Sequence, residues 1–447
     1  MTLLVSLFIM NLDIIFKAKT PVKFGGAGKW KQDDASKLFS SSQSMKFSWV
    51  QGLICFDCGA AFDFQYLLKC TKCGGLLDLV YDLPQTNWAD LTDNNFQGMW
   101  RFHKVLPIRN PAHIVTLGEG STALIPAPRL ARSIGIKSLY LKYEGTNPTG
   151  TVKDRTSSTA VSSAKQFGAS AITVVSTGNA GASLATYAHR GEIPSVIFCY
   201  HRGDPIKMSH MSLMASKFCV FEGEYDDLIR SVDQCVEEGL AFDGGATRNS
   251  FKHEGKKTIA YEVTEALGTV PDFFFSPVAV GEIFIATYRG FDEMQQMGMV
   301  DRMPTLVCCQ SMQAQPIVAA FQSGQPFRPT TIQPTIAKGV AVGDPGPKGP
   351  RVLEILRQHS GMALAVSDAE IQEAQSLLAE SEGLWAGPTG VVSLAALIQA
   401  GRNKQIPSNS SSLCIITETG LTSPYPPAQG QVVKTSLEDV RRLFSCV

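Results

Sequence analysis

Lys153 is the residue of this sequence best placed for covalent chemistry. It lies in the segment Asn147–Arg155 (NPTGTVKDR), where a turn around Pro148 and Gly150 precedes a helix predicted to begin near Thr151. A lysine in the first turn of a helix lies close to positive backbone dipoles and, when shielded from water, loses its proton more easily. Such an amine suits Schiff-base chemistry. The alternative is a solvated lysine followed by a capping aspartate.

A glycine-rich loop offers a second site. Ser176–Ser183 (STGNAGAS) follows a predicted strand and opens a predicted helix. Backbone N–H groups exposed at a helix N-terminus bind anions, and a substrate carboxylate is one such anion. The loop is neither the dinucleotide fingerprint nor the lysine-containing phosphate loop. The alternative is a plain tight turn.

Four cysteines form a third constellation, with the spacing C-x2-C-x11-C-x2-C: Cys55, Cys58, Cys70 and Cys73. Each pair can present two thiolates from one tight turn, and four thiolates complete the closed tetrahedral shell of a structural zinc site. Redox-active or unpaired cysteines are the alternative. A nucleic-acid-binding role is a weaker one, because the segment is not notably basic.

The elements that must position these residues alternate between strand and helix from about residue 115. Alternation at this spacing predicts a mostly parallel sheet covered by helices, an α/β fold. The predicted strands are 138–142, 171–176, 195–199, 273–278, 305–310 and 413–417, and the clearest helices are 155–167, 182–190 and 283–297.

Composition narrows the class of protein. The chain has 447 residues, with 40 Lys+Arg against 40 Asp+Glu. Zero net charge argues against nucleic acid or an anionic membrane as the main partner. The apolar N-terminus is too short to span a bilayer and lacks the features of a secretory signal. The odd count of 11 cysteines does not suit a disulfide framework. We therefore expect a soluble, cytoplasmic enzyme.

Taken together, these motifs resemble threonine synthase and, more broadly, the fold-type-II (tryptophan synthase β-like) enzymes that use pyridoxal phosphate. The resemblance covers roughly residues 115–425 and extends to three further segments: Leu117–Leu124 (LGEGSTAL), Glu254–Glu262 (EGKKTIAYE) and Thr335–Gly339 (TIAKG). It implies two open, twisted α/β lobes, and it fits an N-terminal zinc-ribbon-like segment, which some threonine synthases also carry.

The resemblance also implies roles for individual residues. Lys153 corresponds to the catalytic lysine that joins the cofactor and then moves protons. The other cofactor-binding positions are Asn179 at the ring oxygen, Thr417 at the pyridine nitrogen, and Val278 and Gly281 at the phosphate. Substrate-binding positions are Ser176, Thr177, Gly178 and Lys207. A neutral hydroxyl facing the pyridine nitrogen favours elimination and replacement over transamination.

Two segments depart from the family pattern. Pro277–Ile283 (PVAVGEI) stands where the family has a glycine-dense phosphate loop, and Glu282 falls where backbone amides should meet the phosphate. The segment 417–424 (TETGLTSP) places Glu418 where the family has glycine. These changes predict a repositioned loop or a weaker hold on the cofactor. They also point to a specialised relative of threonine synthase.

The implied activity is the elimination of a β or γ leaving group, often phosphate, from an amino acid, followed by addition of water or another nucleophile. Alternatives are replacement on O-phosphoserine as in cysteate synthase, deamination as in threonine dehydratase, and a non-catalytic binding protein. Candidate cations for a leaving phosphate are Arg155, Lys207, Arg248 and Lys252. Cofactors would be pyridoxal phosphate and structural zinc, and a homodimer is usual in the family.

The expected domain organisation has four parts. Residues 1–50 form a weakly ordered N-terminal extension, and residues 51–82 form a zinc-ribbon-like segment. The large pyridoxal-phosphate domain consists of two pieces, 83–155 and 265–447, and the small α/β domain comprises residues 156–264.

Overall fold

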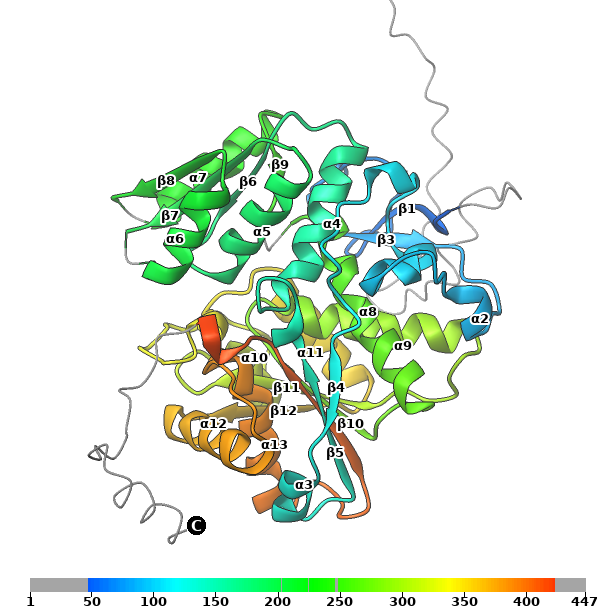
Figure 1. Cartoon of the computed structure of the whole chain (residues 1–447), viewed down its shortest axis with the longest axis vertical. Helices are drawn as coiled ribbons and strands as arrows, with labels where there is room; N and C mark the ends of the chain where they lie inside the picture. The colour runs from blue at the N-terminus through cyan, green and yellow to red at the C-terminus, as the bar shows by residue number, and fades with distance from the viewer. Residues whose placement is uncertain (1–46, 202, 224, 246–247, 423–447) are drawn as a thin grey trace, which may run out of the picture.

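Three β-sheets organise the chain. The computed structural model describes residues 47–201, 203–223, 225–245 and 248–422. Figure 1 shows a smaller lobe at the top, a larger lobe below it and a small antiparallel sheet beside the helices that join them. The expectation for an N-terminal extension falls mostly on residues 1–46, which lie outside the described residues.

The large sheet has the strand order β12-β11-β10-β13-β5-β4, with all neighbours parallel except β4 and β5. Consecutive residues such as Phe274 and Phe275 in β10 enter opposite cores, as the two-residue repeat of a strand requires. The strands are β4 (Ala123–Pro126), β5 (Ser138–Tyr143), β10 (Phe273–Pro277), β11 (Thr305–Ser311), β12 (Met362–Val366) and β13 (Ser411–Ile416).

Helices cover both faces of this sheet. Three helices share one apolar core with it, namely α3 (Pro128–Ile134), α12 (Asp368–Glu382) and α13 (Val392–Arg402). Four helices share the core on the other face, namely α8 (Ser250–Leu267), α9 (Glu282–Gln296), α10 (Pro316–Ser323) and α11 (Lys348–Gln358). A parallel sheet buried on both faces accounts for its nearly continuous apolar strands.

The smaller sheet is parallel throughout, in the order β8-β7-β6-β9. Its strands are β6 (Ile172–Val175), β7 (Ser195–Tyr200), β8 (Lys217–Phe221) and β9 (Phe242–Asp243). Its helices are α5 (Asn179–Arg190), α6 (Pro205–Met214) and α7 (Tyr225–Glu237). α4 (Lys153–Gln166) packs against both α5 and α8 and so lies between the two lobes.

The cysteine segment forms the third sheet, in the order β2-β1-β3. Its antiparallel strands are β1 (Val50–Cys55), β2 (Ala61–Asp63) and β3 (Leu77–Tyr81). Phe251 of α8 is fully buried in the core of this sheet, so the segment is attached directly to the larger lobe.

The remaining elements are short. They are α2 (Trp88–Leu91) and the 3-10 helices η1 (Gly98–Val105), η2 (Pro111–His113), η3 (Glu144–Thr146), η4 (Lys338–Val340), η5 (Thr389–Val391) and η6 (Gly420–Thr422). Within the described ranges, none of the helices combines the length and the apolar character that crossing a bilayer requires.

The predicted α/β architecture is confirmed: every strand and helix predicted by range is present, with its ends shifted by a few residues. In the two α/β sheets, sequence patterning did not locate β4, β8, β9 or β12. β9 has only two residues, and the alternation of buried and exposed residues in β8 is irregular.

Candidate active site

Lys153 is the first residue of α4 and is half-buried. It faces a cavity between the lobes, whose wall also includes Thr156, Ser157, Lys252 and Glu282. Burial lowers the pKa of the Lys153 amine, as does the neighbouring Lys252, whereas Glu282 and Glu418 oppose that shift. The lysine predicted from the sequence is therefore at a helix N-terminus in a partly desolvated cavity.

Asp154 fixes the turn that presents Lys153. Its carboxylate accepts hydrogen bonds from the Thr149 N–H at 2.6 Å, the Thr149 hydroxyl at 2.5 Å and the Ser183 hydroxyl at 2.6 Å. Ser183 belongs to α5, so this carboxylate ties together the helices that carry Lys153 and Asn179. Burial raises the pKa of Asp154 to about 6.

Asn179 begins α5, and its side-chain amide donates to the carboxylate of Glu418. Glu418 is buried and lies just beyond β13. Burial raises its pKa, while Lys207, the Asn179 amide and Lys153 oppose that shift. The residue that replaces a family glycine is therefore a buried acid bonded to a predicted cofactor ligand.

The predicted carboxylate loop connects β6 to α5. The Ser176 hydroxyl accepts from the backbone N–H of Gly178 at 3.3 Å and of Gly181 at 3.0 Å, which holds the loop in shape. Thr177 is exposed, and a side chain at Gly178 would come within 3.9 Å of the Lys207 stem. Lys207 therefore lies over the loop, with its amine 3.9 Å from Asp204.

Thr417 follows the last residue of β13 and is buried. Its carbonyl accepts from the N–H of Val152 at 2.9 Å, which places it next to Lys153 in space. Its hydroxyl has no hydrogen-bond partner among the described residues. A buried hydroxyl without a partner costs about 1–3 kcal/mol, so its presence favours a ligand at this position.

Gly281 precedes α9 in the left-handed conformation, with φ 98°. A Cβ at this position would meet Val352 at 2.7 Å, so glycine is required there. Val278 is packed in the apolar core and its N–H donates to the Cys309 carbonyl at 2.8 Å. Of the two predicted phosphate positions, only Gly281 is therefore next to a helix N-terminus.

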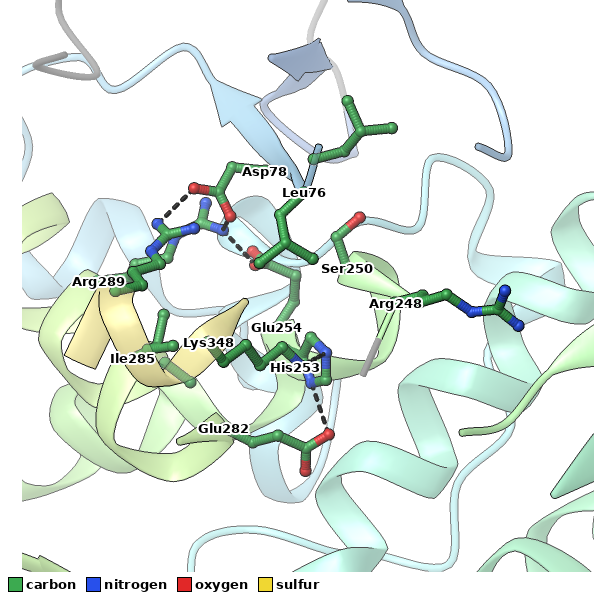
Figure 2. Close-up of a pocket in the computed structure, with 13 residues that line it drawn as sticks. Leu76, Asp78, Arg248, Ser250, His253, Glu254, Glu282, Ile285, Arg289 and Lys348 are labelled. Atoms are coloured by element: carbon green, nitrogen blue, oxygen red, sulfur yellow. Dashed lines mark hydrogen bonds and ion pairs between the residues drawn. The ribbon is translucent and has the colours of Figure 1, made fainter. Parts of the chain in front are cut away.

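Glu282, the first residue of α9, lies close to several basic side chains, of which Figure 2 shows His253 and Lys348. The Lys256 amine lies 2.6 Å from its carboxylate, His253 Nδ1 lies 3.0 Å away and the Lys252 amine lies 3.6 Å away. Lys348 of α11 contacts the other nitrogen of His253 at 2.6 Å. We call these five residues the Glu282 cluster.

Two of the candidate cations for a leaving phosphate, Arg155 and Arg248, do not line the cavity of Lys153. Arg155 is fully buried in ion pairs with Glu144 at 2.7 Å and Glu262 at 2.6 Å, so it stabilises the fold. Arg248 pairs with Asp233 of α7 at 2.6 Å. Lys207 and Lys252 are the candidates that remain near the cavity.

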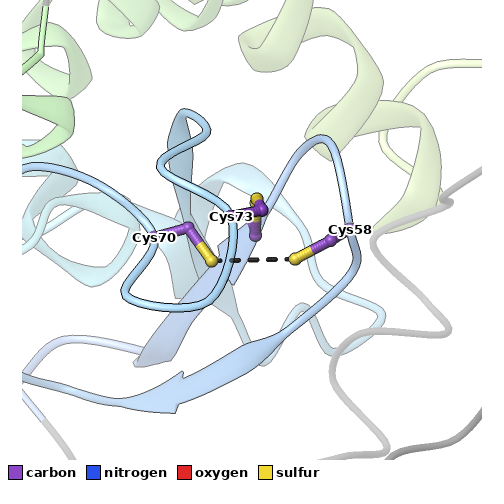
Figure 3. A group of neighbouring side chains, drawn as sticks. Cys58, Cys70 and Cys73 are labelled. Atoms are coloured by element: carbon purple, nitrogen blue, oxygen red, sulfur yellow. Dashed lines mark hydrogen bonds between the residues drawn. The ribbon is translucent and has the colours of Figure 1, made fainter.

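The sulfur atoms of the four cysteines all lie within 4.8 Å of one another, and Figure 3 shows Cys58, Cys70 and Cys73 of this group. The Cys55–Cys73 and Cys58–Cys70 sulfur pairs are 3.4 and 3.6 Å apart. Tetrahedral zinc with sulfur at about 2.3 Å separates its ligands by about 3.8 Å. Gly59 and Gly74, which follow the pairs, have φ of 68° and 78°, as the tight turns require.

The cavity residues fit pyridoxal phosphate. Lys153 and Lys252 line the cavity and suit the cofactor aldehyde and phosphate, while the Asn179 amide and the Thr417 hydroxyl, which has no partner among the described residues, belong to residues next to the lining and suit the ring. The sequence model of the pyridoxal-phosphate dependent enzymes matches residues 115–418. The chain belongs to this family of pyridoxal-phosphate dependent enzymes.

Threonine synthases are among its curated relatives within the family. The enzyme of Methanocaldococcus jannaschii is 33% identical over 377 residues, which make up 83% of this chain and 92% of that protein. The enzyme of Synechocystis sp. is 32% identical, over 75% of this chain and 86% of its own. The resemblance to threonine synthases seen in the motifs is thus confirmed.

Solved structures confirm the fold. Maize serine racemase superimposes with a TM-score of 0.58 at 17% identity, covering 73% of this chain and 92% of its own. The processed form of threonine deaminase isoform 2 from Solanum lycopersicum superimposes with a TM-score of 0.57 at 15% identity, covering 75% of this chain and 89% of its own. The expected fold-type-II architecture of two α/β lobes is correct.

Sequence reasoning missed three members of the Glu282 cluster: His253, Lys256 and Lys348. Lys256 belongs to a motif that supported the resemblance, but no spacing rule pairs it with a residue 26 positions later. Lys348 lies 95 positions from His253. Only the packing of α8, α9 and α11 brings these residues together.

Proposed function

We propose that this protein is a pyridoxal-phosphate dependent lyase of the threonine synthase type. It eliminates a β or γ leaving group, often phosphate, from an amino acid and adds water or another nucleophile. In the threonine synthase reaction, O-phosphohomoserine and water give threonine and phosphate. The observation that supports the proposal is that Lys153 faces the cavity, that Asn179 adjoins the lining residue Ala180, and that the Thr417 carbonyl accepts from the N–H of Val152, next to Lys153.

Within this proposal the cofactor, when bound, supplies the electron sink that stabilises negative charge at the substrate α-carbon. Lys153 removes the proton from that carbon, and burial assists it by lowering the pKa of its amine. Asn179 orients the ring through its amide. The Thr417 hydroxyl is a neutral partner for the ring nitrogen, which keeps that nitrogen unprotonated and favours elimination.

Substrate contacts come from the β6–α5 loop and two lysines. In this proposal the backbone N–H and hydroxyl of Thr177, just before α5, bind the substrate carboxylate, because the N–H groups of Ser176 and Gly178 already donate to the Phe198 carbonyl and the Ser176 hydroxyl. Lys207 and Lys252 supply positive charge for a phosphate leaving group.

Borohydride reduction tests the cofactor assignment. The purified protein, incubated with pyridoxal phosphate and reduced, should carry a stable adduct on the peptide that contains Lys153, detected by mass spectrometry. Loss of the visible absorption band on reduction is the parallel measurement. A protein that forms no adduct in excess cofactor contradicts the proposal and supports a non-catalytic role.

A substrate panel then separates the reactions. O-phosphohomoserine should release phosphate and give threonine. O-phosphoserine with sulfite tests a cysteate synthase-like reaction, and threonine and serine test deamination. The curated relatives favour the first outcome over the other two and over a non-catalytic protein.

For the cysteine segment we propose a structural zinc ion held by Cys55, Cys58, Cys70 and Cys73. The support is the clustering of four sulfurs at distances suited to tetrahedral binding. Elemental analysis of the purified chain should find one zinc per chain. Cys58→Ser should lower that content, whereas Cys235→Ser, at an exposed cysteine outside the cluster, should not.

Three further expectations complete the proposal. The lobes divide at residues 155/156 and 264/265, after a ribbon at 51–82. The enzyme is a homodimer, as is usual in the family, and it acts in the cytoplasm on a small amino-acid substrate. Sedimentation and limited proteolysis test the first two of these.

A further inference from the structure

Glu418 is a buried carboxylate that connects the two lobes beside the cavity of Lys153. It accepts a hydrogen bond from the side-chain amide of Asn179, the first residue of α5 in the smaller lobe (Figure 1). Glu418 itself follows β13 of the large sheet, with one residue between them. Asn179 adjoins Ala180, which lines the cavity. The contact between these two side chains therefore spans the lobes next to the wall of the cavity.

The backbone around Glu418 is held by the segment that leads into Lys153. Glu418 pairs with Thr151 in an isolated antiparallel bridge. The N–H of the next residue, Thr419, donates to the Gly150 carbonyl at 2.9 Å. Because these contacts fix the main chain, the carboxylate of Glu418 extends from a rigid support toward α5.

Burial of this carboxylate costs stability. Glu418 is 5% exposed, and its hydrogen-bond partner among the described residues is a neutral amide rather than a cation. Burial raises the pKa of Glu418, and Lys207, the Asn179 amide and Lys153 oppose that rise. A buried charge is costly unless hydrogen bonds or ion pairs compensate it. The bond from Asn179 provides part of this compensation, so the two side chains hold each other in place.

The bond to Glu418 leaves the Asn179 amide able to bind a second acceptor. A side-chain amide has two N–H groups, and Glu418 engages one of them. An ionised carboxylate can only accept hydrogen bonds, so it selects the orientation in which the nitrogen of the amide, and not its oxygen, faces Glu418. Since the amide is planar, fixing one N–H also fixes the direction of the other.

We propose that Glu418 is a positioning residue for the cofactor ring: it holds the Asn179 amide so that the second N–H of this amide meets the ring oxygen. The inference rests on the proposed function, because it needs pyridoxal phosphate to bind beside Lys153. It deepens that function by giving a role to a residue that stands where the family pattern has glycine. Tighter binding of the ring then offsets the cost of burying the carboxylate.

The test compares pyridoxal phosphate with 3-deoxypyridoxal phosphate, which lacks the ring oxygen. Apo protein of the full chain is titrated with each compound, and the ratio of the two dissociation constants measures the preference for the ring oxygen. Glu418→Leu removes both carboxylate oxygens and should lower this preference about fivefold, because the Asn179 amide loses its anchor. Glu418→Gln keeps an acceptor oxygen and should leave the preference within about twofold of that of the natural chain.

A double-mutant cycle tests whether Glu418 acts through Asn179. Asn179→Ala alone should lower the preference about fivefold, because it removes the donor to the ring oxygen. Glu418→Leu added to Asn179→Ala should then lower the preference no further, since the amide that Glu418 positions is absent. An additional fall as large as that of Glu418→Leu alone would overturn the proposal.

Tyr187→Phe is the matched control. The Tyr187 hydroxyl donates to the buried carboxylate of Glu119 at 2.8 Å, so this bond also connects α5 to a buried carboxylate. The variant should lower the stability of the fold without changing the preference for the ring oxygen. If the preference falls as far in Tyr187→Phe as in Glu418→Leu, any loosening of α5 has this effect, and the proposal is overturned.

The outcomes separate the two proposals. If the natural chain binds neither compound at Lys153, the proposed function fails, and this inference fails with it. If both compounds bind and Glu418→Leu keeps the preference of the natural chain, only the positioning role is excluded. If Glu418→Leu does not fold, Glu418→Ala takes its place with the same expected fall. If neither variant folds, Glu418 is a residue that the fold requires, and the positioning role is overturned.

Discussion

The two ends of the cavity are built in different ways. At the ring end, Lys153, Asn179 and Thr417 are the residues that the proposed function assigns to the cofactor ring, and short local motifs carry them. At the other end, Glu282 and the basic residues around it come from three helices. In the proposed function, the residues assigned to bond chemistry therefore lie on local motifs, whereas the end assigned to the phosphate is built from residues far apart in the sequence.

This difference suggests that binding strength and chemistry can change separately. An ion pair such as Lys256–Glu282 is formed by side chains, so one substitution can strengthen or weaken it. The ring end depends on hydrogen bonds that also hold the lobes together, such as that from Asn179 to Glu418. Substitutions at the two ends should therefore differ in their effects on turnover, cofactor affinity and stability. Four variants test this.

Lys153→Ala should have the largest effect. Turnover should fall by about 10³-fold or more, because no other amine takes the proton from the α-carbon. The borohydride adduct should disappear as well, while non-covalent binding of pyridoxal phosphate persists through the Glu282 cluster. Activity assays and a binding titration check the two parts. Full turnover in this variant would show that Lys153 does not perform the bond chemistry assigned to the ring end.

Cys58→Ser comes next, because it damages the ribbon that packs against the phosphate end. The free energy of unfolding should fall by about 3 kcal/mol if a structural metal is lost. Asp78 of β3 pairs with Arg351 of α11 and lies 3.7 Å from Arg289 of α9, so the ribbon supports the walls around the Glu282 cluster. Affinity for pyridoxal phosphate should therefore fall more than affinity for pyridoxal. If the affinities for pyridoxal phosphate and for pyridoxal fall equally, the ribbon does not support the phosphate end of the cavity.

Thr417→Val should have two smaller effects of opposite sign: the apo protein should become more stable, and cofactor binding should become weaker. It removes a buried hydroxyl that has no partner among the described residues, so the apo protein should become about 1 kcal/mol more stable. The holo protein loses a ring contact, and both cofactor forms should bind about fivefold more weakly. Thermal unfolding and titration measure these. Thr417→Ser, which keeps the hydroxyl, is the control for affinity.

The sequence predicted the ring end because its signals are local. A turn followed by a helix placed Lys153 in the first turn of a helix, and a strand followed by a glycine loop placed Asn179 near the start of the next helix, while the proposed roles of both residues came from the family resemblance. The phosphate end could not be predicted beyond the anomaly at Glu282, because its partners lie 26 to 30 positions away on α8. Arg155 was misassigned for the same reason: its partner Glu262 lies 107 positions away.

Glu418→Gln should have the smallest effect and a distinct pH dependence. The folded-state pKa of Glu418 is raised, first by burial, while Lys207, Asn179 and Lys153 oppose the shift and Asp204 reinforces it. A folded state that binds this proton more tightly than the unfolded state loses stability as the pH rises above the unfolded value of about 4.5. The variant keeps the bond to Asn179 but has no proton to lose, so it should be about 1 kcal/mol more stable at neutral pH.

The advantage of Glu418→Gln should vanish near pH 4, because the folded state then keeps Glu418 protonated and the unfolded state gains little by releasing the proton. Chemical denaturation at both pH values measures this, with Glu373→Gln as an exposed control. An advantage that persists at pH 4 would show that the gain is unrelated to the buried charge.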